Sequence, residues 1–381
     1  MNGNVLHEML IEDHRHDGLR SGEGCVVAAD DKALLFIYGN FHGPADHDHA
    51  TLVERRSTDG GVTWSPATTV LETPRGGLNV MSVSLLRLAD GRIGAAYLDK
   101  RSTDDCRPRF MVSTDEGRTW SDPELMVQRP GYYVVNNDRL VQLSSGRLLA
   151  PYAYYEPGRI VRRTPEGSPC GCLLSDDGGA SWRLGQQEQR ILPQNVLRPR
   201  QVREGDAETE KFLEARTIVA QEPGVVELLD GRVLMWVRTN GGYAYRCFSS
   251  DDGETWTPFT AITEFAMPCG PQSVWRLPGS ERLVMLYNDR EGVPFGTPEF
   301  MWRTPLSVAV SDDDAVTWQR HTPLEADDSV NYCYYSLCFF DGRAIATYYQ
   351  GVSTRADDGS ERRRNLHSLK VKVVEQGFFA G

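Results

Sequence analysis

The sequence contains no apolar run that approaches eighteen residues, so it predicts no membrane span. It also lacks an excess of basic residues: 41 Lys and Arg stand against 53 Asp and Glu, which gives a net charge of −12. A nucleic-acid-binding protein needs a basic face, so this balance disfavours that class and a nucleic-acid partner. Residues 1–18 have neither a basic start nor an apolar stretch, so we expect no signal peptide and a cytoplasmic protein.

Cysteine pairs with metal-binding spacing are absent too. The eight Cys are scattered without a CxxC pair, and the single residue between Cys170 and Cys172 suits a zinc site poorly. We therefore expect buried, reduced thiols. Helical periodicity is nearly absent and no domain boundary is visible, so the sequence predicts a single all-β domain over residues 1–381.

What the sequence does contain is a repeat. The pattern S-x-D-x-G-x-T/S-W occurs five times, at residues 57–64, 113–120, 175–182, 249–256 and, with Ala315 in place of the glycine, 311–318. Asp and Ser favour tight turns, Gly accepts a positive φ, and Trp anchors the turn through its large apolar area. Since each copy follows a short β-rich run, we expect every copy to be a hairpin turn with a structural role.

A second hairpin signature alternates with this repeat. Turns that contain Gly-Arg join β-branched runs at residues 88–93, 143–148, 229–233 and 340–344. The two kinds of turn define a unit of four short strands, and the Trp of the repeat recurs every 56 to 74 residues. This period predicts a six-bladed β-propeller of four-stranded antiparallel blades. Five blades carry the repeat, and the sixth combines residues 369–374 with the N-terminal region.

The five repeats are Asp boxes, and along nearly its whole length the chain resembles the sialidase (neuraminidase) superfamily of BNR/Asp-box proteins. The resemblance implies an exo-acting, retaining glycoside hydrolase that releases a terminal acidic sugar, such as sialic acid, from the non-reducing end of a glycan without a cofactor. Asp boxes also occur in other glycosidases, in polysaccharide lyases and in non-enzymatic propellers. The alternatives are therefore a hydrolase or lyase for rhamnose, arabinose or uronate, and a non-catalytic glycan-binding propeller.

The resemblance also implies site residues. Sialidases hold the substrate carboxylate with clustered Arg, whose planar forks bind it bidentately, and they use a Tyr nucleophile that a Glu activates. Residues 221–238 resemble the segment that runs from this Glu to the second Arg, which implies these roles for Glu222 and Arg238. Arg303, ahead of the fifth repeat, stands where the family has its third Arg. The alternative is that Glu222 and Arg238 form a surface ion pair and that Arg303 is a solvated charge at a strand edge.

The segment 332–337 resembles the stretch that carries the nucleophilic Tyr. Tyr335 fits best and Tyr334 is the neighbouring possibility; since side chains alternate along a strand, only one of them can face the site. The family's acid/base Asp lies on a loop before the first repeat, where Asp46 and Asp48 are both candidates and Asp48 is preferred. Three His in this loop would also suit a metal, but they lack helical ligand spacing, and we predict none.

The N-terminal end departs from the family pattern. Sialidases carry an Arg-Ile-Pro motif there, whereas this sequence has Arg20 without the Ile-Pro and with Glu23 close by. A Glu among the Arg residues would neutralise part of their field and compete for them, which motivates the alternative sugars. Two polar clusters at strand ends add candidates for contacts with substrate hydroxyls, namely Arg101, Arg107 and Asp138. The alternative is that these residues only stabilise the turns in which they occur.

Overall fold

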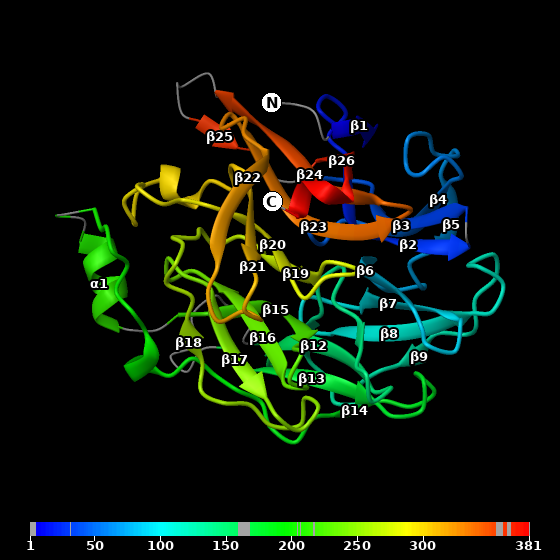
Figure 1. Cartoon of the computed structure of the whole chain (residues 1–381), viewed down its shortest axis with the longest axis horizontal. Helices are drawn as coiled ribbons and strands as arrows, with labels where there is room; N and C mark the ends of the chain where they lie inside the picture. Colours follow the sequence, from blue (N-terminus) through cyan, green and yellow to red (C-terminus); the bar gives the residue numbers. More distant parts are fainter. Residues whose placement is uncertain are drawn as a thin grey trace.

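The structure is a computed structural model that describes residues 5–380 apart from 31, 159–167, 204, 206, 216–217, 356–360 and 364–366. Figure 1 shows its sheets arranged in sequence order around a common centre, which makes the fold an all-β propeller. The described part has one α-helix, α1 (Ala207–Ala215), at the periphery, and 3-10 helices at Pro193–Asn195, Glu299–Met301 and Gln376–Phe379. None of the described helices is long and apolar enough to cross a membrane.

Four sheets are separate blades. Three have four strands in chain order: β2 (Arg20–Asp30), β3 (Ala33–Phe41), β4 (Ala50–Ser57) and β5 (Thr68–Leu71); β15 (Ala220–Glu227), β16 (Val233–Thr239), β17 (Tyr245–Ser249) and β18 (Thr260–Ala261); β19 (Ser273–Arg276), β20 (Leu283–Asn288), β21 (Leu306–Ser311) and β22 (Gln319–Glu325). The fourth has the order β1 (Val5–Glu12), β26 (Ser368–Glu375), β24 (Arg343–Arg355) and β23 (Val330–Phe340), with β25 (Glu361–Arg363) beside β24. As predicted, the C-terminal strand pairs with the N-terminal region, so both ends of the chain share one blade.

The remaining strands form one nine-stranded sheet: β6 (Asn79–Arg87), β7 (Ile93–Lys100), β8 (Cys106–Ser113), β9 (Glu124–Leu125), β10 (Tyr132–Val134), β11 (Val141–Gln142), β12 (Leu148–Tyr155), β13 (Cys170–Ser175) and β14 (Arg183–Leu184). The short strand β10 joins its two parts, because Tyr132 pairs antiparallel with Tyr155 of β12 and parallel with Cys106 of β8. The prediction of six separate four-stranded blades is therefore wrong. The structure has four blades and this larger sheet, and a three-residue strand carries no sequence pattern that predicts such a fusion.

The Asp boxes form the same turn in all five copies. In the first, Ser57 Oγ donates to Asp59 Oδ1 at 2.8 Å and accepts from the Gly61 N–H at 2.9 Å. Asp59 accepts from the N–H and the hydroxyl of Thr63 at 2.9 and 2.6 Å, and Trp64 Nε1 donates to the Gly61 carbonyl at 3.0 Å. The Ser–Asp and Asp–Thr or Asp–Ser bonds recur in the other four copies. In each box the Ser, the Asp and the Thr or Ser side chains thus satisfy one another, which fits a structural role, whereas the indole N–H groups of Trp120, Trp256 and Trp318 are buried without a partner among the described residues.

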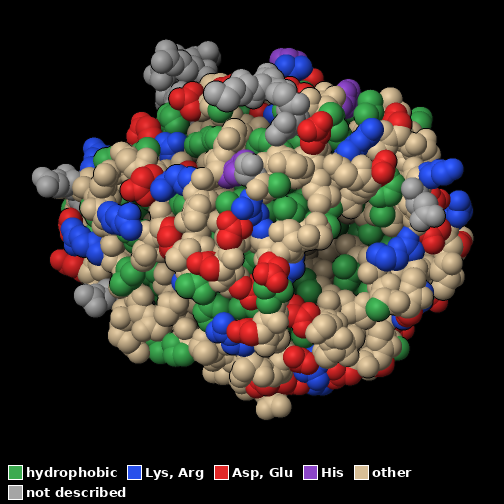
Figure 2. Space-filling model, in the orientation of Figure 1, with side chains coloured by type: hydrophobic (Ala, Val, Ile, Leu, Met, Phe, Trp, Pro, Cys, Tyr) green, Lys and Arg blue, Asp and Glu red, His purple; other side chains and the backbone are tan. Residues whose placement is uncertain are grey.

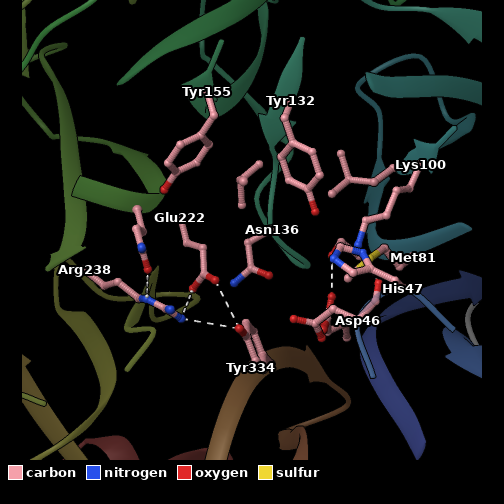
Figure 3. A pocket seen from close by; sticks show the side chains of 15 residues that line it. Asp46, His47, Met81, Lys100, Tyr132, Asn136, Tyr155, Glu222, Arg238 and Tyr334 are labelled. Carbon is pink, nitrogen blue, oxygen red and sulfur yellow. Dashed lines mark hydrogen bonds and ion pairs between the residues drawn. The ribbon is translucent and has the colours of Figure 1, made fainter. Parts of the chain in front are cut away.

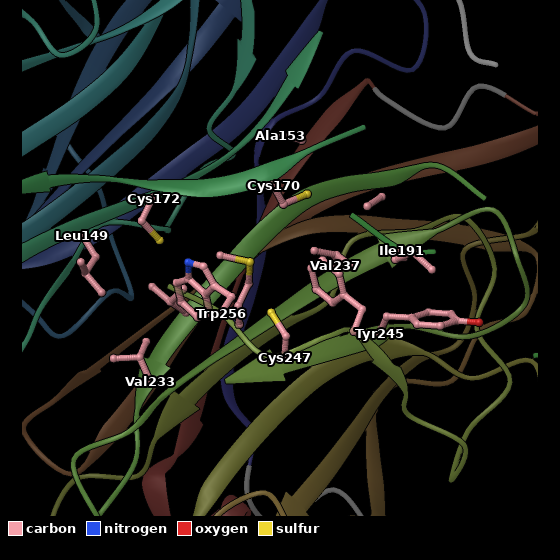
Figure 4. Close-up of a cluster of buried hydrophobic side chains, with 14 of the residues drawn as sticks. Leu149, Ala153, Cys170, Cys172, Ile191, Val233, Val237, Tyr245, Cys247 and Trp256 are labelled. Carbon is pink, nitrogen blue, oxygen red and sulfur yellow. The ribbon is translucent and has the colours of Figure 1, made fainter. Parts of the chain in front are cut away.

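Apolar side chains fill the spaces between the sheets. Figure 4 shows one such cluster, in which Leu149 and Cys172 of the nine-stranded sheet pack with Val233 and Cys247 of the blade β15–β18 and with Trp256 of the fourth Asp box. Burial of this kind stabilises the fold by roughly 25 cal/mol for each Å² of apolar surface. None of the eight cysteines, all of which the structure describes, forms a disulfide, and six of them are buried, as predicted.

Replacing Asp59 with Ala should lower the free energy of unfolding by about 1–2 kcal/mol, because Ser57 and Thr63 lose their acceptor. Desolvation raises the pKa of Asp59, but the Thr63 bonds outweigh it and hold the pKa at about 2. The contribution is therefore present at neutral pH and is lost as the pH falls toward 2. The control Asp59→Asn keeps one acceptor oxygen, so its free energy of unfolding, measured in urea, should fall by less. Equal losses in the two variants would contradict the structural role.

Candidate active site

Four inner strands carry the same backbone irregularity. The register of β2, β6, β15 and β23 shifts against the next strand by a bulge. The residue inside each bulge has a positive φ: 53° at Glu23, 58° at Ser82, 47° at Glu222 and 58° at Tyr334. This conformation costs about 1–2 kcal/mol for a residue other than glycine, and bulges of this kind redirect side chains. All four side chains line one cavity.

The cavity has a volume of about 340 Å³, which is the size of a small-molecule site. Figure 3 shows Glu222 and Arg238 beside Tyr334 on one side and Asp46, His47 and Lys100 on the other. Besides these and the other two bulge residues, the lining consists of Met81, Leu98, Tyr132, Val134, Asn136, Tyr155 and Gln221. On the face of the molecule in Figure 2, acidic and basic side chains are interspersed, so charge of both signs is available to a ligand that approaches that face.

Tyr334, Glu222 and Arg238 are joined by hydrogen bonds. The Tyr334 hydroxyl donates to Glu222 Oε1 at 3.1 Å. Arg238 Nη1 donates to Glu222 Oε2 at 2.6 Å and to the Tyr334 oxygen at 3.4 Å, and Arg238 Nε donates to Gln221 Oε1 at 2.9 Å. Arg303 lies on the Tyr334 side as well, with its Cζ 5.7 Å from the centre of the Tyr334 ring. A phenol, a carboxylate and the Arg238 guanidinium therefore occupy one wall, while Arg303 lies beside the Tyr334 ring outside the cavity lining and donates from Nε to the Cys269 carbonyl at 3.3 Å.

The charges around Tyr334 act on its phenol in opposite directions. Burial raises the pKa of Tyr334 and Glu222 raises it further, whereas Arg238 and Arg303 lower it, and the net change is upward. The phenol is therefore neutral in the free protein, and its proton points at a carboxylate. Burial lowers the pKa of Arg238, but the charge of Glu222 outweighs this effect and keeps the guanidinium protonated. This arrangement can pass a proton from Tyr334 to Glu222 while the phenol oxygen bonds to an electrophilic carbon.

Arg20 binds the two carboxyl groups of the opposite wall. Its Nη1 donates to Asp46 Oδ1 at 2.5 Å, its Nη2 to Glu23 Oε1 at 3.2 Å, and its Nε to the Tyr349 hydroxyl at 3.0 Å. The guanidinium also lies 3.9 Å over the Phe41 ring, and the Arg20 side chain is only 1% exposed. Arg20 is not part of the cavity lining, whereas the two carboxyl groups that it binds are.

Two buried side chains hold the backbone of the Asp46 loop. Lys100 Nζ donates to the Asp46 carbonyl at 2.6 Å, and Asn79 Nδ2 donates to the carbonyls of Asp46 and Asp48 at 2.9 Å each. Desolvation raises the pKa of the Asp46 carboxyl, but the charge and hydrogen bond of Arg20 outweigh it, so the net change is downward. Asp46 is thus ionised at neutral pH in the free protein, with 62% of its side chain exposed.

Glu23 has both carboxyl oxygens engaged. Oε1 accepts from Arg20, and Oε2 accepts from Ser82 Oγ at 2.5 Å. Burial raises the pKa of Glu23, and the nearby Asp46 raises it too, although Arg20 lowers it; the net change is upward. A carboxyl group at the position where the sequence departs from the family pattern therefore lies directly against Arg20.

The structure corrects two preferred assignments. Tyr335 does not face the cavity: its hydroxyl donates to Asn288 Oδ1 at 2.8 Å, and its ring is 1% exposed in the apolar core between blades. Tyr334 lines the cavity instead, because the bulge in β23 redirects its side chain. Asp48 accepts a hydrogen bond from a backbone N–H of its own loop at 2.7 Å and lies outside the lining, whereas Asp46 belongs to it.

Three other candidates lie outside the cavity lining: Arg101, Arg107 and Asp138. Each of the two arginines forms an ion pair with the Asp two positions before it in the chain, at 2.9 and 2.8 Å. Asp138 is buried and accepts hydrogen bonds from the Leu337 N–H and from Trp275 Nε1, both at 3.1 Å. It thereby ties segments of different sheets together, and its contacts are structural.

No sequence pattern marks the aromatic wall of the cavity. Tyr132 and Tyr155 are register partners on β10 and β12, and their ring centres lie 6.4 Å apart, edge to face. They were missed because β10 belongs to neither of the repeating turn signatures. Lys100 and Asn136 also line the cavity, and both belong to the polar clusters at strand ends that the sequence does mark.

The loop that carries Asp46 has three histidines. The rings of His42 and His49 lie 4.9 Å apart, and His47 lines the cavity. Within the part of the chain that the structure describes, no group of three or more His, Cys, Asp and Glu side chains is placed to hold a metal ion. The groups of the cavity that can move a proton are thus carboxyl and phenol groups, with the imidazole of His47 beside them.

Comparisons of this chain with known proteins agree with the repeat, the fold and the cavity. The chain belongs to the BNR repeat-like domain family of the sialidase superfamily: the family model matches residues 99–342, and residues 55–66 match the BNR/Asp-box repeat. A sialidase of Bacteroides fragilis (strain YCH46) is 23% identical over 361 residues, which covers 85% of this chain and 59% of that protein. A sialidase of Micromonospora viridifaciens is 25% identical over 307 residues, which covers 70% and 40%. The chain thus spans about half the length of these relatives.

Solved structures share the fold. A protein of unknown function from Dyadobacter fermentans DSM 18053 superposes with a TM-score of 0.68 at 18% identity, over 98% of this chain and 100% of that one. Trypanosoma rangeli sialidase in complex with the inhibitor DANA has a TM-score of 0.64 at 14% identity, over 97% of this chain and 58% of that one. At these identities the likeness shows the fold alone, so the activity has to be argued from the cavity.

Proposed function

We propose that the protein is a glycoside hydrolase of sialidase type, which releases a terminal acidic sugar from a glycan with retention of configuration. One observation carries the proposal: the Tyr334 hydroxyl donates to Glu222 in a cavity where Asp46 lines the opposite wall. A scaffold has no need to hold a tyrosine in a strained conformation against a buried carboxylate. The sialidase relatives support the same activity.

Tyr334 is the nucleophile in this proposal. Its oxygen bonds to the anomeric carbon while its proton passes to Glu222, and the bond from that carbon to the leaving oxygen breaks. A neutral nucleophile suits a sugar whose anomeric carbon carries a carboxylate, because a charged nucleophile would be repelled by it. Arg238 and Arg303, beside the Tyr334 ring, hold that carboxylate and offset its charge.

Asp46 is the acid and then the base. In the first step it gives its proton to the leaving oxygen, which departs as the alcohol of the remaining glycan. In the second step it takes a proton from a water molecule, whose oxygen attacks the anomeric carbon and displaces the tyrosine, and Glu222 returns the proton to the phenol. Two displacements at one carbon retain the configuration.

Tyr334→Phe should lower kcat roughly a thousandfold or more, because the attacking oxygen is gone, and should change KM by less than about threefold. Tyr335→Phe is the matched control. It loses the buried hydrogen bond to Asn288, so it should lower stability by about 1–2 kcal/mol and leave kcat nearly intact.

Hydrolysis of a fluorogenic sialoside measures kcat and KM for both variants, and thermal unfolding measures their stability. Aryl uronides, rhamnosides and arabinosides in the same assay identify the sugar that the wild-type protein prefers. An active Tyr334→Phe variant, or equal losses of kcat in the two variants, would remove Tyr334 from the mechanism.

The value of kcat/KM should rise as the pH falls from 7 toward 4. Asp46 acts in its acid form, and Arg20 lowers the pKa of Asp46 below its usual 3.8, so the protonated fraction grows about tenfold with each unit of pH. Arg20→Met removes the lowering charge and should move the profile to higher pH, whereas Asp46→Asn should flatten it. The substrate for this profile is an alkyl glycoside, whose leaving oxygen needs a proton. A profile that Arg20→Met does not move would contradict the role of Asp46.

A further inference from the structure

The hydrogen-bonding edges of Arg20 are already used within the protein. Nη1 binds Asp46, Nη2 binds Glu23 and Nε binds Tyr349, so all three nitrogen atoms have a partner. The side chain is 1% exposed and is covered on one face by Phe41. Because the Arg20 side chain is buried and each of its three nitrogen atoms already donates to a protein oxygen, it presents no solvent-facing edge for the bidentate grip of a third carboxyl group.

Unlike Arg20, Arg238 has a nitrogen atom that makes no hydrogen bond to the described residues. Its Nη1 and Nε are bonded to Glu222 and Gln221, whereas its Nη2 makes no hydrogen bond to the described residues. The side chain lines the cavity, and Arg303 is half-buried next to Tyr334. The Nη2 group of Arg238 is therefore available on the Tyr334 side, where Arg303 adds positive charge from outside the lining, while the opposite side offers the carboxyl oxygens of Glu23 and Asp46. The cavity is polarised across its width.

The backbone holds Glu23 in its place against Arg20. Glu23 is in the left-handed bulge of β2, and its partner Ser82 is in the corresponding bulge of β6. The Glu23 side chain is 4% exposed, with one oxygen on Arg20 and the other on the Ser82 hydroxyl. Two strained residues on neighbouring inner strands thus fix one carboxyl group, and strain that the surrounding structure maintains is typical of functional sites.

We propose that Glu23 is a specificity-determining residue that withdraws Arg20 from the substrate, so that Arg238 and Arg303 alone hold the acid group of the sugar and its hydroxyl groups donate to Asp46. This inference rests on the proposed function and deepens it. The substrate class that follows is a sugar with one acid group at the anomeric end and hydroxyl donors on the far side. On that far side the carboxyl groups of Glu23 and Asp46 disfavour a second acid group, although Lys100 and His47 also line it.

A double-mutant cycle on Glu23 and Arg20 tests the inference. The probe is DANA, a carboxylate-bearing sialic acid analogue, and calorimetry measures its Kd at pH 7. In the wild-type background, Arg20→Lys should change Kd by less than about threefold, since Arg20 does not bind the ligand. Glu23→Ala should tighten binding about tenfold by releasing Arg20, and adding Arg20→Lys should abolish that gain. Arg238→Lys, the matched control, should weaken binding at least about tenfold in both backgrounds.

Inorganic sulfate provides a second probe that does not depend on the sugar. Sulfate should raise the Tm of Glu23→Ala more than that of the wild-type protein, and Arg20→Lys should cancel the difference. If Glu23→Ala does not fold, Glu23→Gln takes its place in the cycle, with a smaller change of the same sign because it removes only the charge.

The outcomes separate the inference from the proposed function. If the wild-type protein binds DANA and Arg20→Lys weakens binding as much as Arg238→Lys does, Arg20 is a substrate ligand; the inference is overturned while the proposed function stands. If DANA binds no variant but the sulfate effect depends on Glu23 and Arg20 as described, the inference stands and the preference for sialic acid falls. If neither probe responds to Glu23, the inference is wrong.

Discussion

The hydrogen bond from the Tyr334 hydroxyl to Glu222 is the contact on which the cavity depends. The two residues are 112 positions apart in the chain and belong to different blades, so the bond forms only when the ring of sheets has closed. The inner strands β15, β19 and β23 contact one another in turn, and β23 contacts β2. The pairing of β1 with β26 completes the blade that carries Tyr334, so closure of the fold and assembly of the site are one event.

Bulges in the inner strands convert this architecture into a site. A regular strand would direct successive side chains to opposite faces of its blade, into the apolar spaces between sheets. The left-handed residues Glu23, Ser82, Glu222 and Tyr334 interrupt that alternation at corresponding places and turn polar side chains toward one cavity. The apolar packing between sheets and the hydrogen-bonded Ser–Asp turns of the Asp boxes provide the stability that offsets the strain of these four positions.

Two of these four bulge residues, Glu222 and Glu23, pair with the arginines in and behind the cavity walls. Glu222 balances Arg238 next to the phenol, while Glu23 and Asp46 together occupy Arg20 on the opposite wall. Arg303 adds a positive charge beside Tyr334. A ligand thus meets Arg238 with Glu222 beside the phenol on one side, and Glu23 and Asp46 with Lys100 on the other.

The Asp boxes made the propeller predictable, because a turn motif that recurs with a nearly constant period leaves few other folds. The number of blades was not predictable, since β10 joins two parts through three residues without a pattern. Local resemblance was enough to find Glu222 and Arg238. The choice between Tyr334 and Tyr335 depends on a bulge that alternation does not reveal, and the choice between Asp46 and Asp48 depends on a loop held by Lys100 and Asn79.

The most direct test of the account is to trap the glycosyl group on the protein. A 2,3-difluorinated sialic acid should form a covalent adduct, because fluorine next to the anomeric carbon slows both displacements, while the fluoride leaving group keeps the first fast enough for the adduct to accumulate. Mass spectrometry of the digested protein should find one adduct per chain, and fragmentation should place it on Tyr334. An adduct on Glu222 or Asp46, or no adduct under conditions in which the sialoside is hydrolysed, would contradict the account.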